Sequence, residues 1–147
     1  MITAQRLISQ ARLWNGTPYH DQAHTRGVGC DCVGLFVGLG SELGIWLISD
    51  DEYPVEPTGE EMLSFLQLNC TPTGARSLDE TTPADIVAMT MRSTPGPHHL
   101  VLRSEHGIIH AFGDMVREEP LFGRQRFHSA WRHKEVLPWP VQSRRAQ

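Results

Sequence analysis

The sequence predicts an α+β domain, with N-terminal helices packed on a mainly antiparallel β-sheet of about five strands. Two observations lead to this class. The first half carries apolar residues at the three- and four-residue spacing of one-sided helices. The second half, after Pro72 and Gly74, carries short aliphatic and β-branched runs bounded by turn residues, which are typical of strands.

The first helix is expected to follow Thr3, whose hydroxyl can cap its start. The residues at one-sided helical spacing are Ala4, Leu7, Ile8, Ala11 and Trp14. The run 15–18, Asn-Gly-Thr-Pro, ends this helix because Gly suits a left-handed cap and Pro cannot continue the helix. A polar loop over 19–29 follows.

A second helix is expected to begin at Asp31. Its apolar side consists of Cys32, Leu35, Phe36, Leu39 and Leu43. The glycines at 34, 38 and 40 each cost the helix up to about 1 kcal/mol relative to alanine. Glycines at this density indicate that another backbone segment packs very close to the helix.

A linker over 53–57 leads to a third helix, in which Thr58 and Glu61 form a capping box and which extends to about Leu68. Strands are then expected at 86–89, 99–103 and 107–112, with weaker candidates at 115–118 and 131–137. The second and third of these runs predict a hairpin around residues 104–106.

The length of 147 residues is typical of one domain, which we expect to cover 1–140 and to be followed by a disordered tail over 141–147. A formal net charge of −4 argues against nucleic acid as the main partner. No secretion signal opens the chain, and no apolar run approaches the roughly 18 residues of a membrane span. We therefore expect synthesis in the cytoplasm and no membrane span.

The three cysteines, Cys30, Cys32 and Cys70, cannot form a closed disulfide set, and an odd number leaves at least one free thiol. Cys32 is the candidate nucleophile because it lies where a glycine-rich turn becomes a helix. Unpaired N–H groups and the helix dipole at such a position favour the thiolate, which is the reactive form of cysteine.

A thiol nucleophile needs an imidazole as base and a third group to orient it. His99 begins one predicted hairpin strand and His110 lies near the end of the next. With a turn near residues 104–105, these two positions lie opposite each other with their side chains on one face. We therefore expect His99 to be the base and His110 its orienting partner. The adjacent His98 points to the other face of a regular strand, so a one-residue register error would exchange the two histidines.

Four blocks of the sequence, in order over roughly 4–137, resemble the NlpC family of papain-like cell-wall cysteine peptidases. The first is Gly16-Thr17-Pro18-Tyr19 followed by Gly27-Val28-Gly29-Cys30-Asp31-Cys32-Val33-Gly34-Leu35. The others are Thr82-Pro83-Ala84-Asp85-Ile86-Val87, His99-Leu100-Val101-Leu102 and Ile109-His110-Ala111. The paired Gly-Cys-Asp-Cys and the short length are similar to the branch found in tailed phages and gene transfer agents. Val33 and Ala84 depart from the family pattern, which has Ser and Gly there.

The resemblance implies a papain-like fold and a Cys-His-His site of Cys32, His99 and His110, with the Tyr19 hydroxyl near the oxyanion. It implies no cofactor and no metal. The implied activity is hydrolysis of peptidoglycan stem peptides between γ-D-glutamate and the diamino acid. The implied setting is the tail of a virion or phage-like particle, with other tail proteins as partners and the target periplasm as the place of action.

Three alternatives remain open on the sequence. The domain could be a structural tail-tip subunit with idle or auxiliary catalysis, or an amidase that uses the same nucleophile on another bond. A zinc site could be formed by Cys30, Cys32, His98 and His99, although Cys-x-Cys is tighter than the usual zinc spacing.

Overall fold

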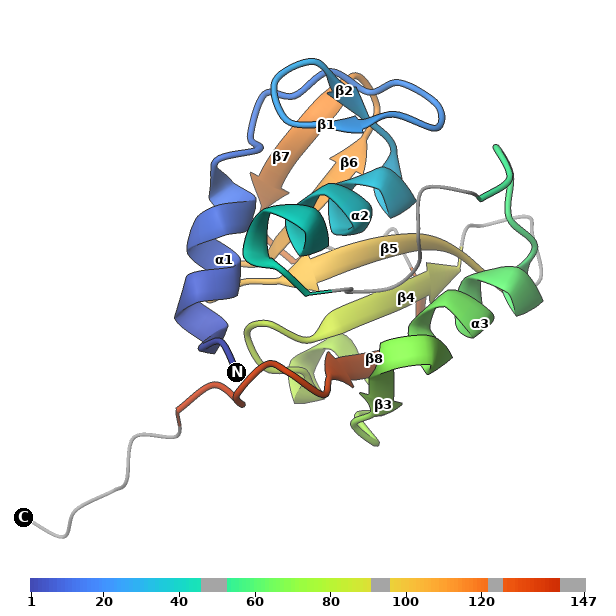
Figure 1. Cartoon of the computed structure of the whole chain (residues 1–147). Helices are drawn as coiled ribbons and strands as arrows, with labels where there is room; N and C mark the ends of the chain where they lie inside the picture. The colour runs from blue at the N-terminus through green and yellow to red at the C-terminus, as the bar shows by residue number, and fades with distance from the viewer. Residues whose placement is uncertain (46–52, 91–95, 122–125, 141–147) are drawn as a thin grey trace, which may run out of the picture.

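The computed structural model describes residues 1–45, 53–90, 96–121 and 126–140. Over these residues it has three α-helices, a six-stranded sheet and a small two-stranded sheet (Figure 1). The helices are α1 (Ala4–Arg12), α2 (Cys32–Leu43) and α3 (Gly59–Asn69). The predicted α+β class is confirmed.

The six-stranded sheet is antiparallel throughout and has the strand order β3-β8-β4-β5-β6-β7. In chain order its strands are β3 (Cys70–Pro72), β4 (Ile86–Thr90), β5 (Pro97–Arg103), β6 (Ile108–Phe112), β7 (Met115–Glu119) and β8 (Arg126–His133). The small sheet pairs β1 (His24–Thr25) with β2 (Gly29–Cys30), and a 3₁₀ turn spans Leu78–Glu80.

The helix starts are those that the sequence predicts. The Thr3 hydroxyl accepts from the Arg6 N–H at 3.0 Å at the start of α1. Both hydrogen bonds of the Thr58–Glu61 capping box are present at the start of α3. These signals lie within four residues of the helix they begin, which is why the sequence reveals them.

The core lies mainly between the helices and one face of the sheet (Figure 1). Helix α2 packs against β5 and β6, and α3 packs against β5 and β3. The strands contribute to this core alternate residues that include Ile86, Ala88, Leu100, Leu102, Ile109 and Ala111. Their neighbours on the opposite face form a smaller cluster of Val87, Met89, Val101, Ile108 and Ala130. Side chains therefore alternate faces along β4, β5 and β6, as regular strands require.

Several strand predictions are corrected by the structure. The weak candidate at 131–137 is instead β8, which begins at Arg126 and ends at His133, and β1, β2 and β3 were not predicted. Strands of two or three residues are too short to show an alternating pattern. The predicted disordered tail at 141–147 lies outside the described residues.

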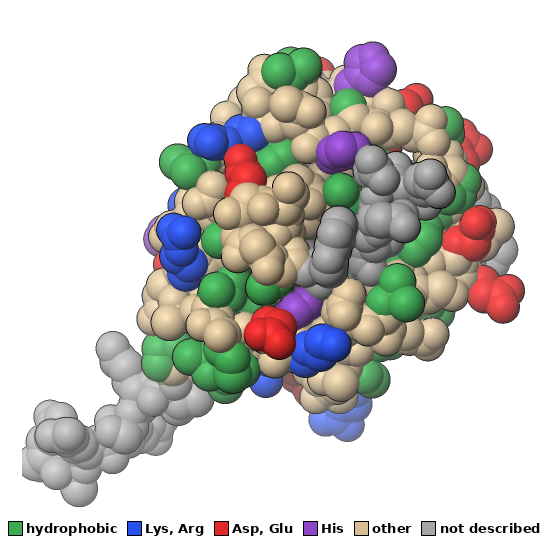
Figure 2. Space-filling model, viewed as in Figure 1, with side chains coloured by type: hydrophobic (Ala, Val, Ile, Leu, Met, Phe, Trp, Pro, Cys, Tyr) green, Lys and Arg blue, Asp and Glu red, His purple; other side chains and the backbone are tan. Residues whose placement is uncertain are grey.

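The face seen in Figure 2 carries acidic and basic side chains interspersed among apolar ones. No helix in the described ranges is long and apolar enough to cross a membrane.

Candidate active site

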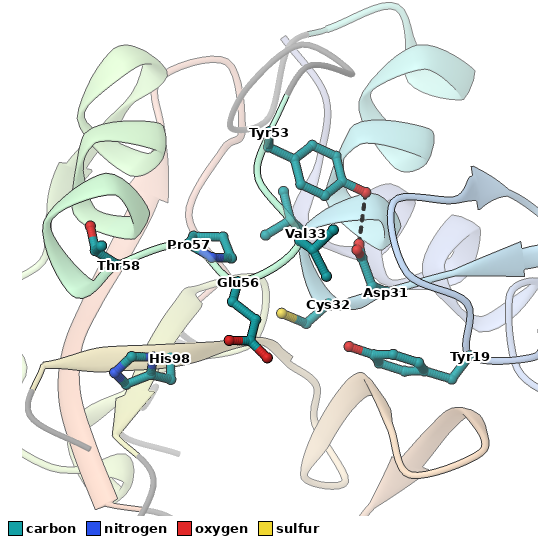
Figure 3. A pocket seen from close by; sticks show the side chains of 10 residues that line it. Tyr19, Asp31, Cys32, Val33, Tyr53, Glu56, Pro57, Thr58 and His98 are labelled. Carbon is teal, nitrogen blue, oxygen red and sulfur yellow. Dashed lines mark hydrogen bonds between the residues drawn. The ribbon is translucent and has the colours of Figure 1, made fainter.

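A pocket of about 450 Å³ opens beside the start of α2 (Figure 3). Its walls come from the loop before β1, the start of α2, the segment that leads into α3, and β5. The lining residues are Tyr19, Asp31, Cys32, Val33, Tyr53, Val55, Glu56, Pro57, Thr58 and His98. Residues from four distant parts of the chain therefore meet at Cys32.

Asp31 fixes the start of α2 and so the position of Cys32. One carboxylate oxygen accepts from the Gly34 N–H and from the Tyr53 hydroxyl, both at 2.7 Å. The other oxygen accepts from the Gln22 N–H at 2.7 Å. Asp31 is 5% exposed, and its three bonds tie the helix to the loop before it and to the segment after it. The predicted linker over 53–57 is thus a wall of the pocket.

The glycines of α2 allow the close packing that the sequence predicts. A Cβ at Gly34 would lie 2.0 Å from the backbone oxygen of Ala23, and a Cβ at Gly38 would lie 2.1 Å from the Trp14 ring. No side chain fits at either distance. The helix start is therefore pressed against the loop that carries Tyr19, and Cys32 is held close to that loop.

The Cys32 sulfur lies beside β5. The described ladder between β5 and β6 has two residue pairs, Leu102 with Ile109 and Arg103 with Ile108. The Ser104 N–H bonds across the hairpin, so the Leu100 N–H, four residues earlier, points to the same side. That N–H donates to the Cys32 sulfur. The start of α2 is therefore in contact with the backbone of β5 directly after His99.

The surroundings of Cys32 favour the neutral thiol. Burial raises its pKa to about 11, which outweighs the lowering by hydrogen bonds from the N–H groups of Leu100, Val33 and Cys32 itself. The negative charge of Asp31 acts in the same direction as burial. The N–H groups at the helix start favour the thiolate, as the sequence predicts, but burial has the larger effect on the pKa.

His99 and His110 form a buried hydrogen-bonded pair. His99 Nε2 lies 2.8 Å from His110 Nδ1, and the two residues are 5% and 0% exposed. Burial lowers the pKa of both rings, that of His99 to about 3, so both are neutral at pH 7. The predicted partnership of these two residues is thus present in the geometry.

The register of the hairpin differs by one residue from the prediction. Its turn is centred on residues 105–106, and the observed pairs place His110 opposite Val101 when the register is continued. His99 and His110 are therefore diagonal neighbours rather than directly opposite. Their side chains still share a face, and the 2.8 Å contact spans the diagonal.

His98 lies in the pocket, but its ring points away from the Cys32 sulfur (Figure 3). Thr90 pairs with Pro97 and Met89 with His99, so His98 is the extra residue of a β-bulge in β5. His98 and His99 thus have different surroundings, one in the pocket and one bonded to His110. The Cys32 sulfur bonds to the N–H of the residue directly after His99.

Tyr19 forms the opposite wall of the pocket, and its hydroxyl points toward the Cys32 side chain (Figure 3). Its backbone is fixed by a bridge to Cys30 and by its N–H, which donates to the Asp114 oxygen at 2.9 Å. Burial raises the pKa of Tyr19, and the neighbouring Cys32 and Asp31 side chains raise it further. The hydroxyl therefore remains a protonated donor beside the sulfur.

Glu119 is a member of the site that the sequence did not reveal. Its carboxylate lies 2.6 Å from Nε2 of His110. Glu119 ends β7, nine residues after His110, and no local motif links the two. Only the pairing of β6 with β7 brings them together.

The proposed zinc ligands do not converge. Cys30 is fully buried in the core, His99 bonds to His110, and His98 points away from Cys32. Within the described ranges, no group of three or more His, Cys, Asp and Glu side chains is arranged to hold a metal ion.

Solved structures of NlpC/p60 domains have the same fold as this chain. A protein similar to a lipoprotein of the NLP/P60 family from Staphylococcus aureus has a TM-score of 0.60 and 19% identity over 88% of this chain and 41% of that one. The NlpC/p60 domain of the peptidoglycan hydrolase SagA has a TM-score of 0.58 and 16% identity over 86% of this chain and 96% of that one.

A third similar structure is RipD from Mycobacterium tuberculosis, a non-catalytic NlpC/p60 domain protein adapted to peptidoglycan binding. Its TM-score is 0.52 and its identity 17%, over 89% of this chain and 96% of that one. This chain spans less than half of the staphylococcal protein. No family model and no curated protein matches the sequence. The likeness at these identities is one of fold.

Proposed function

We propose that this chain is a thiol hydrolase of peptidoglycan stem peptides, with Cys32 as nucleophile, His99 as base and His110 as the residue that orients His99. The observation that carries the proposal is the contact of Cys32 with β5, the strand that carries His99. The N–H of Leu100, directly after His99, donates a hydrogen bond to the Cys32 sulfur, and His99 is hydrogen-bonded to His110.

The reaction begins when a ring nitrogen of His99 takes the proton of the Cys32 thiol. The sulfur then bonds to the carbonyl carbon of the scissile amide, whose oxygen becomes an oxyanion. The imidazolium of His99 protonates the leaving amine as the C–N bond breaks, and a thioester remains. Water attacks the thioester, giving one proton to His99. The C–S bond breaks, and that proton returns to the sulfur.

Tyr19 and the N–H of Cys32 are the proposed donors to the oxyanion. Preorganised donors of this kind typically contribute about 3–4 kcal/mol to transition-state stability. The Tyr19 hydroxyl suits the role because it points toward Cys32 and keeps its proton.

The fold and the intact site together support peptidoglycan as substrate. One similar structure belongs to a peptidoglycan hydrolase and another to a non-catalytic peptidoglycan-binding protein. A domain that only binds has no physical need for a buried imidazole pair at a cysteine, so hydrolysis is favoured here. The proposed bond joins γ-D-glutamate to the diamino acid. An amidase would cut elsewhere and release products of different mass.

Mass spectrometry of purified stem peptides tests this function. We expect fragments cut after γ-D-glutamate with the wild-type protein and none with Cys32→Ala. Cys70→Ala is the matched control, because Cys70 is buried in the core away from the pocket. Equal cleavage by wild type and Cys32→Ala would overturn the nucleophile, and binding without cleavage would favour a role like that of RipD.

The setting in a phage-type tail is a separate part of the proposal and rests on the sequence resemblance of the Gly-Cys-Asp-Cys motif. In that setting the chain is synthesised in the cytoplasm, joins other tail proteins in a virion or phage-like particle, and acts in the target periplasm. Mass spectrometry of purified particles from producing cells should detect the chain at a fixed ratio to other tail proteins. Its absence from particles would overturn this setting without affecting the chemistry.

A further inference from the structure

We propose that Glu119 is a positioning residue that sets which ring nitrogens of His110 and His99 carry protons, so that the free nitrogen of His99 is the one available to Cys32. This inference deepens the proposed function and rests on it. Glu119 contacts His110 and acts on His99 only through that ring.

Three side chains form one line of hydrogen bonds across three strands. Glu119 of β7 reaches His110 Nε2 at 2.6 Å, and His110 Nδ1 reaches His99 Nε2 at 2.8 Å. His110 pairs directly with Arg117, so Glu119 is its diagonal neighbour on the same face. The line therefore runs from β7 through β6 to β5.

The direction of these bonds follows from the groups themselves. An ionised carboxylate can only accept hydrogen bonds, so Nε2 of His110 must carry the proton in the contact with Glu119. A neutral imidazole has one N–H, so Nδ1 of His110 is an acceptor. Nε2 of His99 must then donate to it, which leaves Nδ1 of His99 without a proton.

In the proposed reaction, the unprotonated Nδ1 of His99 takes the proton of the Cys32 thiol. If His110 were protonated at Nδ1 instead, His99 would accept at Nε2 and carry its proton on Nδ1. That arrangement puts an N–H donor where the reaction needs a base. The orientation of one carboxylate thus decides between a competent and an incompetent base.

The surroundings hold this line in place. The Phe112 ring is stacked on His110 at 5.4 Å and lies edge-on to His99 at 5.5 Å. A Cβ at Gly107 would lie 1.9 Å from the Glu119 backbone oxygen, so glycine there permits the close approach of β6 and the end of β7. The Glu119 side chain is 26% exposed, whereas that of His110 is fully buried.

The charged groups around His110 have opposite effects on its pKa. The Glu119 carboxylate favours the protonated ring, whereas burial and the positive charge of Arg117 disfavour it. Arg117 is itself paired with Asp114. Among the described residues, Glu119 is therefore the group in contact with His110 that both orders the ring and favours positive charge on the pair during proton transfer.

Nitrogen NMR of the protein labelled with ¹⁵N-histidine tests the assignment directly. Protonated and unprotonated ring nitrogens have distinct shifts, and His99→Gln and His110→Gln identify the two rings among the eight histidines. In the wild type we expect the His99 and His110 rings to be protonated at Nε2 and unprotonated at Nδ1. A wild-type His110 protonated at Nδ1 overturns the proposal.

Two variants of Glu119 separate the effect of its hydrogen-bond acceptor from the effect of its negative charge. Glu119→Met keeps the side-chain length but has no strong acceptor, so we expect mixed tautomers in both rings. Glu119→Gln retains a carbonyl acceptor and should keep the wild-type pattern. Glu118→Gln is the matched control, because it removes the same charge one residue away, where the carboxylate bonds Arg12 and Ser104. A folded Glu119→Met protein with unchanged tautomers overturns the proposal.

Turnover of stem peptides gives a second readout. Glu119→Met should lower kcat about 10- to 100-fold with little change in KM, since it impairs a base whose positioned action contributes 10²–10⁴-fold. Failure of the two proposals is distinguishable. If the wild-type protein cleaves no stem peptide but Glu119→Met shows the expected mixture of tautomers, only the proposed function is contradicted. If the wild-type protein cleaves stem peptides but the histidine tautomers are unchanged in Glu119→Met, only the positioning role of Glu119 is contradicted.

Discussion

At the scale of single residues, the proposed nucleophile and base, Cys32 and His99, are both uncharged at neutral pH. Burial raises the pKa of the Cys32 thiol and lowers that of the His99 imidazole, so neither group carries charge at pH 7. A helix start favours the thiolate, but removal of the sulfur from water costs more here. Proton transfer therefore belongs to the reaction itself and not to the resting protein.

The alkylation rate of Cys32 should show this resting state. With a thiol pKa of about 11, the reactive thiolate fraction should rise about tenfold per pH unit from pH 6 to 10. Iodoacetamide labelling followed by intact-mass measurement gives the rate. Cys32→Ala supplies the background from Cys30 and Cys70, whose pKa values burial raises to about 12. A rate that is flat between pH 5 and 8 would mean a preformed ion pair.

Acid should destabilise the fold through the buried histidines. The pKa of His99 falls from 6.5 to about 3 on folding, so the unfolded chain binds the proton first as pH drops. The stabilisation is present above pH 6.5 and is lost toward pH 3, at about 1.4 kcal/mol per pH unit for each such group.

Urea unfolding at pH 7, 5 and 4 measures this dependence. His99→Gln should show a shallower loss of unfolding free energy with falling pH, because one titrating group is gone. His128→Gln, at an exposed histidine, is the control and should keep the wild-type slope. The same slope in wild type and His99→Gln would contradict the account.

At the scale of elements, the start of α2 is the part that the sequence predicts best. Asp31 is its N-cap, and the turn and cap signals lie within a few residues of the nucleophile. The three glycines of this helix also predict that another backbone segment packs close to it, as one does at Gly34. Its partner, the backbone of Ala23, was not, since contacts between segments have no local signal.

Gly34→Ala should damage both stability and the site. Its Cβ would meet the Ala23 oxygen at 2.0 Å and the Tyr53 hydroxyl at 2.9 Å, so the loop and Asp31 must shift. We expect a loss of about 2–3 kcal/mol in unfolding free energy together with reduced turnover. Urea unfolding and stem-peptide cleavage measure the two effects.

Gly44→Ala, at the C-cap of the same helix, is the matched control. Gly44 has φ +73° and no atom within 4 Å of an added Cβ, so the change costs backbone strain alone, about 1–2 kcal/mol. Its turnover should stay at the wild-type level. Wild-type turnover in Gly34→Ala would show that the close approach does not position Cys32.

At the scale of the whole molecule, the site depends on pairing between distant segments. The sequence predicts Cys32 at the start of a helix and His99 and His110 on neighbouring strands, and the structure has them there. Tyr19 and Cys32 line one pocket, while His99 and His110 form a buried pair. The residues that the sequence could not reveal are Tyr53, in a segment taken as a linker, and Glu119, at the end of an outer strand. Tyr53 bonds to Asp31, 22 residues away in the chain, and Glu119 bonds to His110, 9 residues away. No rule of sequence spacing predicts either contact.

The central claim is that Cys32 attacks the stem peptide, and a trapped thioester tests it most directly. Wild-type protein mixed with stem peptide and quenched in acid should gain the mass of the acyl portion up to γ-D-glutamate, and peptide mapping should place it on Cys32. Cys32→Ala should gain nothing. Cleaved peptide without an adduct on Cys32, or an adduct on Cys30 or Cys70, would contradict the account.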